Sequence, residues 1–284
     1  MPRYNLAGRT VLLTGSTGGL GTALARSLRE RGANLALLDL DGDLARQQAA
    51  DLGPQTAARG WAADVRDLDS LRSAADDAAA HFGRLDVAIA GAGIASMAPL
   101  ETLDPELWER VIDINLSGAW RTFRATLPHV KQTKGYLLAI SSMAAFVHSP
   151  LNGPYVASKA GLWALCDATR LELRHEKVAV GSAHPTFFKT PMMDDIHTDD
   201  AGNTLWGGNR SGLWKMIPLD EVVDAITTGI ERRSPMIVAP RSFALAARVP
   251  GLIRPLVDRI GFRGTTIPDA IAQAKDGWSP RAER

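Results

Sequence analysis

Short apolar runs recur along the chain, with helical stretches between them. Within each run the apolar residues are consecutive rather than alternating, which predicts strands buried on both faces. The runs are residues 11–13, 35–38, 87–89, 137–140, 178–180 and 236–238. Helix boundary residues lie between them: Gly32 and Gly83 at expected C-terminal caps, and Asp104 before Pro105 at an expected start.

This alternation predicts right-handed β–α–β crossovers and the α/β class, a doubly wound parallel sheet with helices on both faces. We expect one domain over residues 1–240, with the repeat occupying residues 5–240. Residues 186–217 lack clear periodicity, which predicts a substrate lid or a disordered loop, and we favour the lid. Residues 241–284 predict a C-terminal extension, either an added helix or a fraying tail.

The composition is typical of a globular chain with a substantial core, since 45% of residues are apolar and 22% are charged. The net charge is +1, so no overall field attracts nucleic acid or an anionic membrane. One cysteine, Cys166, and an N-terminus without a signal-like apolar run lead us to expect a cytoplasmic protein. Arginines and prolines interrupt the most apolar region, residues 243–260, so we expect no transmembrane span.

A glycine-rich loop, Thr14–Gly21, follows the first expected strand and opens a helix. Glycines permit a tight turn and close approach of a pyrophosphate, while helix N–H groups and the helix dipole attract its charge. A plain connection between strand and helix would also explain such a turn. As residues that contact a dinucleotide we predict Gly15, Thr17, Gly19, Leu20 and Gly21.

Asp39 ends the second expected strand, eighteen residues beyond Gly21. Its carboxylate can accept hydrogen bonds from a ribose diol. A 2′-phosphate there would meet a negative charge with no cation to offset it, because residue 40 is Leu and the loop holds no Lys or Arg. We therefore predict NAD as cofactor rather than NADP. If Asp39 is only a solvated strand end, that preference has no basis.

Tyr155 and Lys159 are four residues apart in an expected helix, so their side chains project from one face. A tyrosine acting near neutral pH needs its pKa lowered by about three units, or about 4 kcal/mol. A cation about 4 Å away supplies a similar amount at an effective dielectric constant of about 20. The same spacing also occurs in ordinary surface pairs.

Two further residues complete a pattern: Ser142 lies thirteen residues before Tyr155, and Asn115 lies on the preceding helix. With these and the glycine-rich loop, the chain resembles the short-chain dehydrogenase/reductase family over about residues 6–240. The resemblance implies a Rossmann-type fold and catalysis by Tyr155 as general acid/base. It implies that Ser142 binds the substrate oxygen, that Lys159 binds the nicotinamide ribose and lowers the tyrosine pKa, and that Asn115 holds a relay water.

The resemblance also implies further cofactor contacts. Asp64 and Val65 match the adenine position, and Thr190 matches the residue that binds the carboxamide. A turn or helix cap also explains Asp64, and an ordinary lid position also explains Thr190. The family's Asn-Asn-Ala-Gly is replaced here by Ala-Gly-Ala-Gly at residues 90–93. We predict cofactor contacts for the first three of them, Ala90, Gly91 and Ala92. The missing amide side chains leave local stability in question more than cofactor binding.

A second departure follows the sixth expected strand, where the family's Pro-Gly is Pro185-Thr186, followed by Phe187 and Phe188. Glycine's freedom is lost at that turn. We expect an altered turn beside the nicotinamide, with Pro185 and Phe188 at the cofactor, and a bulkier substrate wall.

The loops at the carboxyl ends of the strands are rich in large apolar residues, which predicts a pocket for an apolar secondary alcohol or ketone. Packing of the lid against the body would also explain these residues. The histidines show no metal-ligand spacing, so we predict no metal. The predicted substrate contacts are Ser142, His148, Phe187, Met192 and Trp206.

These predictions combine into an NAD(P)-dependent enzyme acting on CH–OH groups, with NAD preferred. The alternatives are an NADP-dependent carbonyl reductase and a non-catalytic dinucleotide-binding regulator. By resemblance, helices over 104–131 and 153–177 form the contacts of a homodimer or homotetramer. Residues 243–260 predict an oligomer contact, a flap over the pocket or, least favoured, a peripheral membrane helix.

Overall fold

The computed structural model describes residues 3–274 and contains one seven-stranded, all-parallel sheet. The strand order is β3-β2-β1-β4-β5-β6-β7, which confirms the predicted doubly wound architecture. The strands are β1 (Thr10–Thr14), β2 (Asn34–Asp39), β3 (Ala58–Ala62), β4 (Val87–Ala90), β5 (Tyr136–Ile140), β6 (Ala179–Pro185) and β7 (Met236–Ala239).

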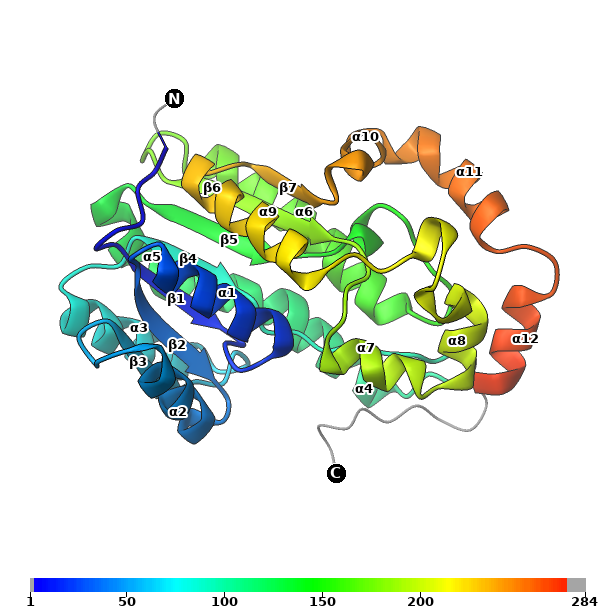
Figure 1. Cartoon of the computed structure of the whole chain (residues 1–284), viewed down its shortest axis with the longest axis horizontal. Helices are drawn as coiled ribbons and strands as arrows, with labels where there is room; N and C mark the ends of the chain where they lie inside the picture. The colour runs from blue at the N-terminus through cyan, green and yellow to red at the C-terminus, as the bar shows by residue number, and fades with distance from the viewer. Residues whose placement is uncertain (1–2, 275–284) are drawn as a thin grey trace.

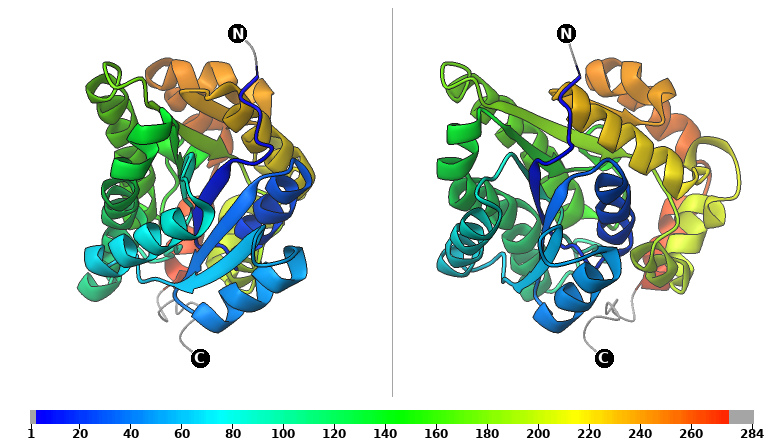
Figure 2. Two further views of the ribbon diagram at one scale, coloured as in Figure 1. Left: turned by 90° about the vertical axis from the view of Figure 1, so that its left-hand side faces the viewer. Right: turned by 60° about the vertical axis from the view of Figure 1, so that its left-hand side comes forward.

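Helices cover both faces of the sheet (Figures 1 and 2). On one face α1 (Gly19–Glu30) and α9 (Leu219–Arg232) pack side by side, and α2 (Gly42–Leu52) covers β2 and β3. The other face carries α3 (Leu68–Phe82), α5 (Gly118–Thr133) and α6 (Gly153–Glu172).

Consecutive strand residues enter different cores, which explains the unbroken apolar runs. In β1, Leu13 joins the cluster under α1 and α9, whereas Leu12 joins the cluster under α3, α5 and α6. The edge strand β3 differs, because its burial alternates and it carries Arg59 and Trp61. It therefore has no apolar run in the sequence.

The helix expected over 104–131 is continuous but not uniform. It begins as α4 (Pro105–Ile112), passes through a π-helical turn over Asp113–Ser117 and continues as α5. Such turns displace side chains relative to a regular helix and often occur at functional sites.

The predicted lid, residues 186–217 and called the lid below, is largely helical, although its sequence showed no periodicity. It contains α7 (Pro191–His197), α8 (Asp200–Trp206) and short 3₁₀ turns over Gly207–Asn209 and Gly212–Trp214. Helices of about two turns are too short for a repeat to emerge from the sequence. At the lid base, the Ile217 amide donates to the Phe187 carbonyl at 2.9 Å.

The C-terminal extension is also helical as far as the structure describes it, and residues 275–284 lie outside the described residues. A 3₁₀ turn over Arg241–Phe243 leads into α10 (Ala244–Arg248), α11 (Pro250–Gly261) and α12 (Thr266–Gln273). Figure 1 shows this segment leaving the end of β7 and reaching the lid, where α12 packs against α8. Within residues 3–274, no helix is long and apolar enough to cross a membrane.

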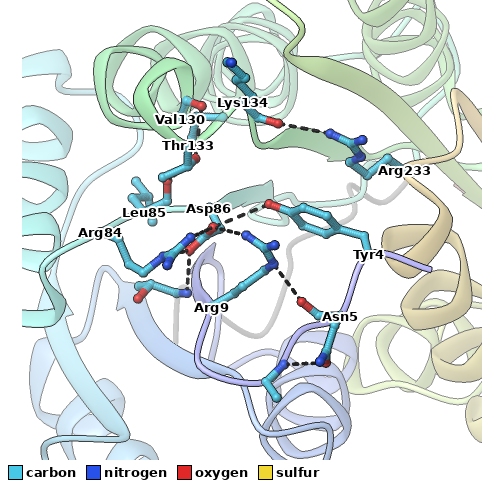
Figure 3. A network of polar contacts seen from close by, with 12 residues as sticks. Tyr4, Asn5, Arg9, Arg84, Leu85, Asp86, Val130, Thr133, Lys134 and Arg233 are labelled. Carbon is cyan, nitrogen blue, oxygen red and sulfur yellow. Dashed lines mark hydrogen bonds and ion pairs between the residues drawn. The ribbon is translucent and has the colours of Figure 1, made fainter. Parts of the chain in front are cut away.

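At the opposite end of the sheet, a buried carboxylate ties the N-terminal segment to the start of β4 (Figure 3). The Asp86 side chain is fully buried and accepts from Arg9 Nη1 at 2.7 Å and from Arg84 Nη2 at 2.6 Å. The Thr10 amide also donates to it, at 3.0 Å. The Arg9 guanidinium stacks on the Tyr4 ring, 4.0 Å from its centroid. This end of the sheet is therefore a structural anchor.

Candidate active site

The glycine-rich loop forms a cradle that side chains would fill. Gly15 has φ +67°, and a Cβ added there would lie 2.7 Å from the Ala92 Cα. A Cβ on Gly21 would meet the Gly15 carbonyl oxygen. Helix α1 starts after Gly18, with no side-chain cap from the described residues and no acidic residue in its first turn. The N–H groups of that turn therefore suit an anion such as a pyrophosphate.

Asp39 faces this loop from the end of β2. Its Oδ2 accepts from the Thr17 amide at 3.0 Å and from Thr17 Oγ1 at 2.8 Å, and its Oδ1 accepts from the Leu40 amide at 2.9 Å. Gln48 of α2 braces the same loop by donating to the Ser16 carbonyl at 2.7 Å. The carboxylate is thus fixed beside the cradle, with accepting capacity left for a ribose diol.

The predicted pair on α6 comes together as its spacing requires. Lys159 Nζ lies 5.4 Å from the centroid of the Tyr155 ring and donates to the Ile140 carbonyl at 2.9 Å. Lys159 is only 5% exposed. The Ser142 hydroxyl accepts from the Ala144 amide at 3.1 Å and also hydrogen-bonds the Tyr155 side chain.

The electrostatics differ from the expectation for Tyr155. Burial raises the pKa of Tyr155, and the Ser142 hydrogen bond offsets this only in part. Burial also lowers the pKa of Lys159 to about 8. In the protein alone, loss of solvent thus outweighs the Ser142 hydrogen bond, and the lowering of the tyrosine pKa by Lys159 stays a prediction.

Asn115 lies in the π-helical turn and is fully buried. Its Oδ1 accepts from the Ile94 amide at 2.8 Å, and its Nδ2 donates to the Ile94 carbonyl at 3.0 Å and to Ser158 Oγ at 3.1 Å. A Cβ on Gly93 would lie 3.2 Å from Asn115 Oδ1 and 3.4 Å from Lys159 Nζ. Asn115 therefore holds the segment after β4 against the Tyr–Lys helix, and its relay water stays a prediction.

The segment Ala90–Gly93, which replaces the family's Asn-Asn-Ala-Gly, has a hydrogen bond from its backbone to the Thr14 side chain. The Thr14 hydroxyl donates to the Ile89 carbonyl at 3.4 Å and accepts from the Gly91 amide at 3.2 Å. A Cβ on Gly91 would lie 2.7 Å from the Thr14 carbonyl oxygen. Thr14 thus satisfies a backbone group next to the segment that lacks the amide side chains.

Asp64, which matches the family's adenine position, forms an ion pair with Arg66. Arg66 Nη2 lies 2.7 Å from Asp64 Oδ2, and its Nε lies 3.0 Å from Oδ1. Hydrogen bonds from Arg66 hold the pKa of Asp64 below its ordinary value. The neighbouring Val65 packs against Gly118, since a Cβ added to Gly118 would lie 3.0 Å from the Val65 side chain. Contact of Asp64 and Val65 with adenine stays a prediction.

The lid begins directly over the glycine-rich loop. A Cβ on Gly19 would lie 2.9 Å from Pro191 Cδ and 3.3 Å from Thr190 Cγ2. Thr190 caps α7 by accepting from the Met193 amide at 3.2 Å. This close approach brings Thr190 to the cradle, and its contact with the carboxamide stays a prediction.

The turn after Pro185 is held by the sheet. The Thr186 amide donates to the Ala239 carbonyl at 2.8 Å, and Phe188 forms a bridge with Ile217. Thr186 is absent from the described residues with positive φ. Threonine therefore replaces the family's glycine without backbone strain.

Most predicted substrate residues lie in the core of the lid. The Phe187 ring contacts Trp206 in a tilted arrangement and Trp214 edge to face, with ring centroids 5.4 Å and 6.1 Å away. Trp206 is 3% exposed, and Met192 packs against the same cluster. The alternative of lid packing thus describes these residues well.

His148 lies beside the C-terminal extension. Burial and the positive charge of Arg254 lower its pKa, and the carboxylate of Asp258 acts in the opposite direction. Arg254 also donates from Nε to the Phe146 carbonyl at 3.2 Å. Contact of His148, Phe187, Met192 and Trp206 with a substrate stays a prediction.

Several site residues have no counterpart among the sequence predictions. Gln48 holds the glycine-rich loop, and Ser158 holds Asn115. His184 is fully buried and lies next to the Ser142 carbonyl. Each bonds a residue distant in the sequence, so no local motif marks it. For His184, its place directly before Pro185 is the only available signal.

Comparison with known proteins bears on the family of this chain. The family model for short chain dehydrogenases matches residues 9–201. A D-threitol dehydrogenase from Mycolicibacterium smegmatis is 34% identical over 76% of this chain and 80% of that protein. A (-)-trans-carveol dehydrogenase from Rhodococcus erythropolis is 36% identical over 67% of this chain and 75% of that protein.

A crystal structure of a short-chain dehydrogenase/reductase from Burkholderia phymatum in complex with NAD shares the fold. Its TM-score is 0.77 at 21% identity, over 89% of this chain and 96% of that one. The matched family model spans the glycine-rich loop, Asn115, Ser142, Tyr155 and Lys159. The chain therefore belongs to the short-chain dehydrogenase/reductase family.

Proposed function

We propose that this oxidoreductase transfers a hydride between NAD(H) and an apolar secondary alcohol or its ketone, with Tyr155 as general acid/base. The observation that carries the proposal is the convergence of Tyr155, Ser142 and Lys159 beside the glycine cradle. The relatives named for threitol and for carveol support alcohol oxidation in general. Because these names denote different alcohols, the choice of an apolar substrate rests on the lid of this chain.

The residues present suit a nicotinamide dinucleotide, which supplies the hydride acceptor or donor when bound. Gly15–Gly21 and the start of α1 would hold its pyrophosphate, and Asp39 its adenosine ribose. The preference for NAD is supported by Asp39, by the adjacent Asp41 and by Leu40, whose side chain offers no positive charge to a 2′-phosphate.

The positions of the side chains support the chemical roles that the family resemblance implies. Ser142 would hold the substrate oxygen close to the Tyr155 hydroxyl, and Tyr155 would take up or supply the proton of that oxygen. Lys159 would stabilise the phenolate form by its charge. Apolar lid residues, including Phe187 and Met192, would exclude water from the reacting carbon.

Initial rates measured by nicotinamide absorbance, with cyclic and long-chain secondary alcohols and with polyols, test this proposal. Wild-type protein should turn over apolar alcohols with NAD. Tyr155→Phe should lower kcat by about 10²-fold or more, with NADH binding unchanged in a fluorescence titration. Intact turnover in this variant would refute the role of Tyr155, and faster turnover with NADP would refute the interpretation of Asp39.

A further inference from the structure

His184 is the most enclosed titratable side chain close to the catalytic residues. It lies near the end of β6, directly before Pro185, and is 0% exposed. Its Nδ1 is 3.2 Å from the Ser142 carbonyl oxygen, and its Nε2 is 2.8 Å from Ser182 Oγ. The Phe146 ring covers it, with a centroid separation of 4.6 Å. Both ring nitrogens therefore have partners.

These partners select one tautomer. A carbonyl oxygen can only accept, so Nδ1 must carry the hydrogen that points to Ser142. Nε2 is then an acceptor and receives the Ser182 hydroxyl hydrogen. Burial lowers the pKa of His184 to about 4, and the charge of Lys159 acts in the same direction. The imidazole is therefore neutral at neutral pH, with a defined donor and a defined acceptor.

The bond to Ser142 lies where the sheet stops holding the chain. The Ser141 amide still donates to the Ala183 carbonyl at 2.8 Å. Beyond that bond the two strands lead into different turns, one carrying Ser142 and the other Pro185. Ser142 then orients its hydroxyl toward Tyr155. His184 is thus a side-chain brace between the turns on both sides of the reacting centre.

We infer that His184 is a positioning residue: its Nδ1–H holds the Ser142 backbone so that the Ser142 hydroxyl faces Tyr155, and Ser182 fixes the tautomer that makes this possible. The kinetic consequence rests on the proposed function. The hydrogen-bond arrangement itself does not, because it concerns the protein without cofactor.

A matched pair of amide substitutions tests the inference kinetically. His184→Asn places an N–H donor near the position of Nδ1 and keeps the bond to Ser142. His184→Gln extends its amide toward Ser182 and loses that bond. We expect His184→Asn to keep kcat near the wild-type value and His184→Gln to lower kcat about tenfold to a hundredfold, with NADH affinity unchanged in both. Thermal unfolding of each variant corrects for the folded fraction, and His129→Asn on α5 is the control for a histidine outside the site.

Nitrogen-15 NMR of the imidazole gives a readout that needs neither cofactor nor turnover. Wild-type protein should show a protonated Nδ1 and a non-protonated Nε2 for His184, and Ser182→Ala should shift the Nε2 signal and admit the other tautomer. A protonated Nε2 in wild-type protein would overturn the inference, as would equal kcat values in the Asn and Gln variants. If wild-type protein turns over no alcohol, the proposed function fails, while the NMR result still decides whether His184 holds Ser142.

Discussion

We expect Asp39 and the residue after it to determine which dinucleotide binds. Asp39 is held by Thr17, and Leu40 is 67% exposed beside it. The double variant Asp39→Ser with Leu40→Arg removes a negative charge and adds a planar donor for a phosphate. We expect its kcat/KM with NADP to rise about tenfold to a hundredfold, with a loss for NAD. Leu40→Met is the control, and an unchanged NADP/NAD ratio in the double variant would refute this role of Asp39.

Sequence reasoning reached the residues whose partners are local or fixed by family spacing. Tyr155 and Lys159 are one helical turn apart, and the glycine-rich loop is continuous in the chain. Gln48 and His184 could not be predicted, because their hydrogen-bond partners, Ser16 and Ser142, lie 32 and 42 residues away in the sequence. Burial was also invisible in the sequence, and in the protein alone it raises the pKa of Tyr155.

At the scale of elements, the C-terminal extension connects the segment after Ser142 with the predicted lid. Arg254 of α11 holds the Phe146 carbonyl in the segment after Ser142, while Trp214 of the lid donates to the Gly261 carbonyl at 3.3 Å. On α12, Ala270 is fully buried in the lid cluster, and Gln273 accepts from Thr204 of α8 at 2.6 Å. The extension therefore supports the lid from outside.

A charge placed between α8 and α12 should release the lid. Ala270→Glu buries an unpaired carboxylate, which we expect to detach α12 and make residues 207–212 sensitive to limited proteolysis. Ala272→Glu, on the exposed face of the same helix, should leave the lid resistant. Equal cleavage of the two variants would show that α12 does not hold the lid.

The sequence predicted strands better than the short helices of the lid and the extension. Apart from the edge strand β3, the strands are buried on both faces, so each of them leaves an apolar run such as Leu35–Leu38. Helices α7 and α8 have about two turns each; α7 packs against α8, and α8 packs against α12. The contact between α8 and α12 joins residues far apart in the chain, so neither the lid helices nor the packing of α8 on α12 left a local pattern.

For the whole molecule, the anchor at Asp86 links folding stability to pH. Burial raises the pKa of Asp86, but hydrogen bonds from Arg84, the Thr10 amide and Arg9 outweigh it and hold the pKa below its ordinary value. Because the folded pKa is depressed, this contribution is present above the ordinary aspartate range and is lost as pH falls through the folded pKa.

Asp86→Asn should therefore lower the free energy of unfolding at pH 7 by about 3 kcal/mol, and the loss relative to wild type should shrink in acid. Urea unfolding at neutral and acidic pH measures both effects. Asp69→Asn, which breaks the exposed pair with Arg72, should change little. A deficit for Asp86→Asn that is the same at both pH values would contradict the linkage.

We propose that the helices over 104–131 and 153–177 form the contact of a homo-oligomer, as the sequence led us to expect. Trp108 and Trp120, both in the stretch over 104–131, are 41% and 48% exposed. Trp120→Glu should reduce the mass measured by light scattering, whereas Leu252→Glu, at a 79% exposed position of α11, should not. A reduced mass only in Leu252→Glu would assign the contact to the extension instead.

The position of α12 against α8 also sets an order of events during synthesis. The sheet, the glycine-rich loop and Tyr155 all precede α12 in the chain, so they leave the ribosome before it. Until α12 follows, the apolar face of α8 that it covers is in contact with water. A nascent chain can thus form the sheet and the glycine-rich loop while the lid still lacks its contact with α12.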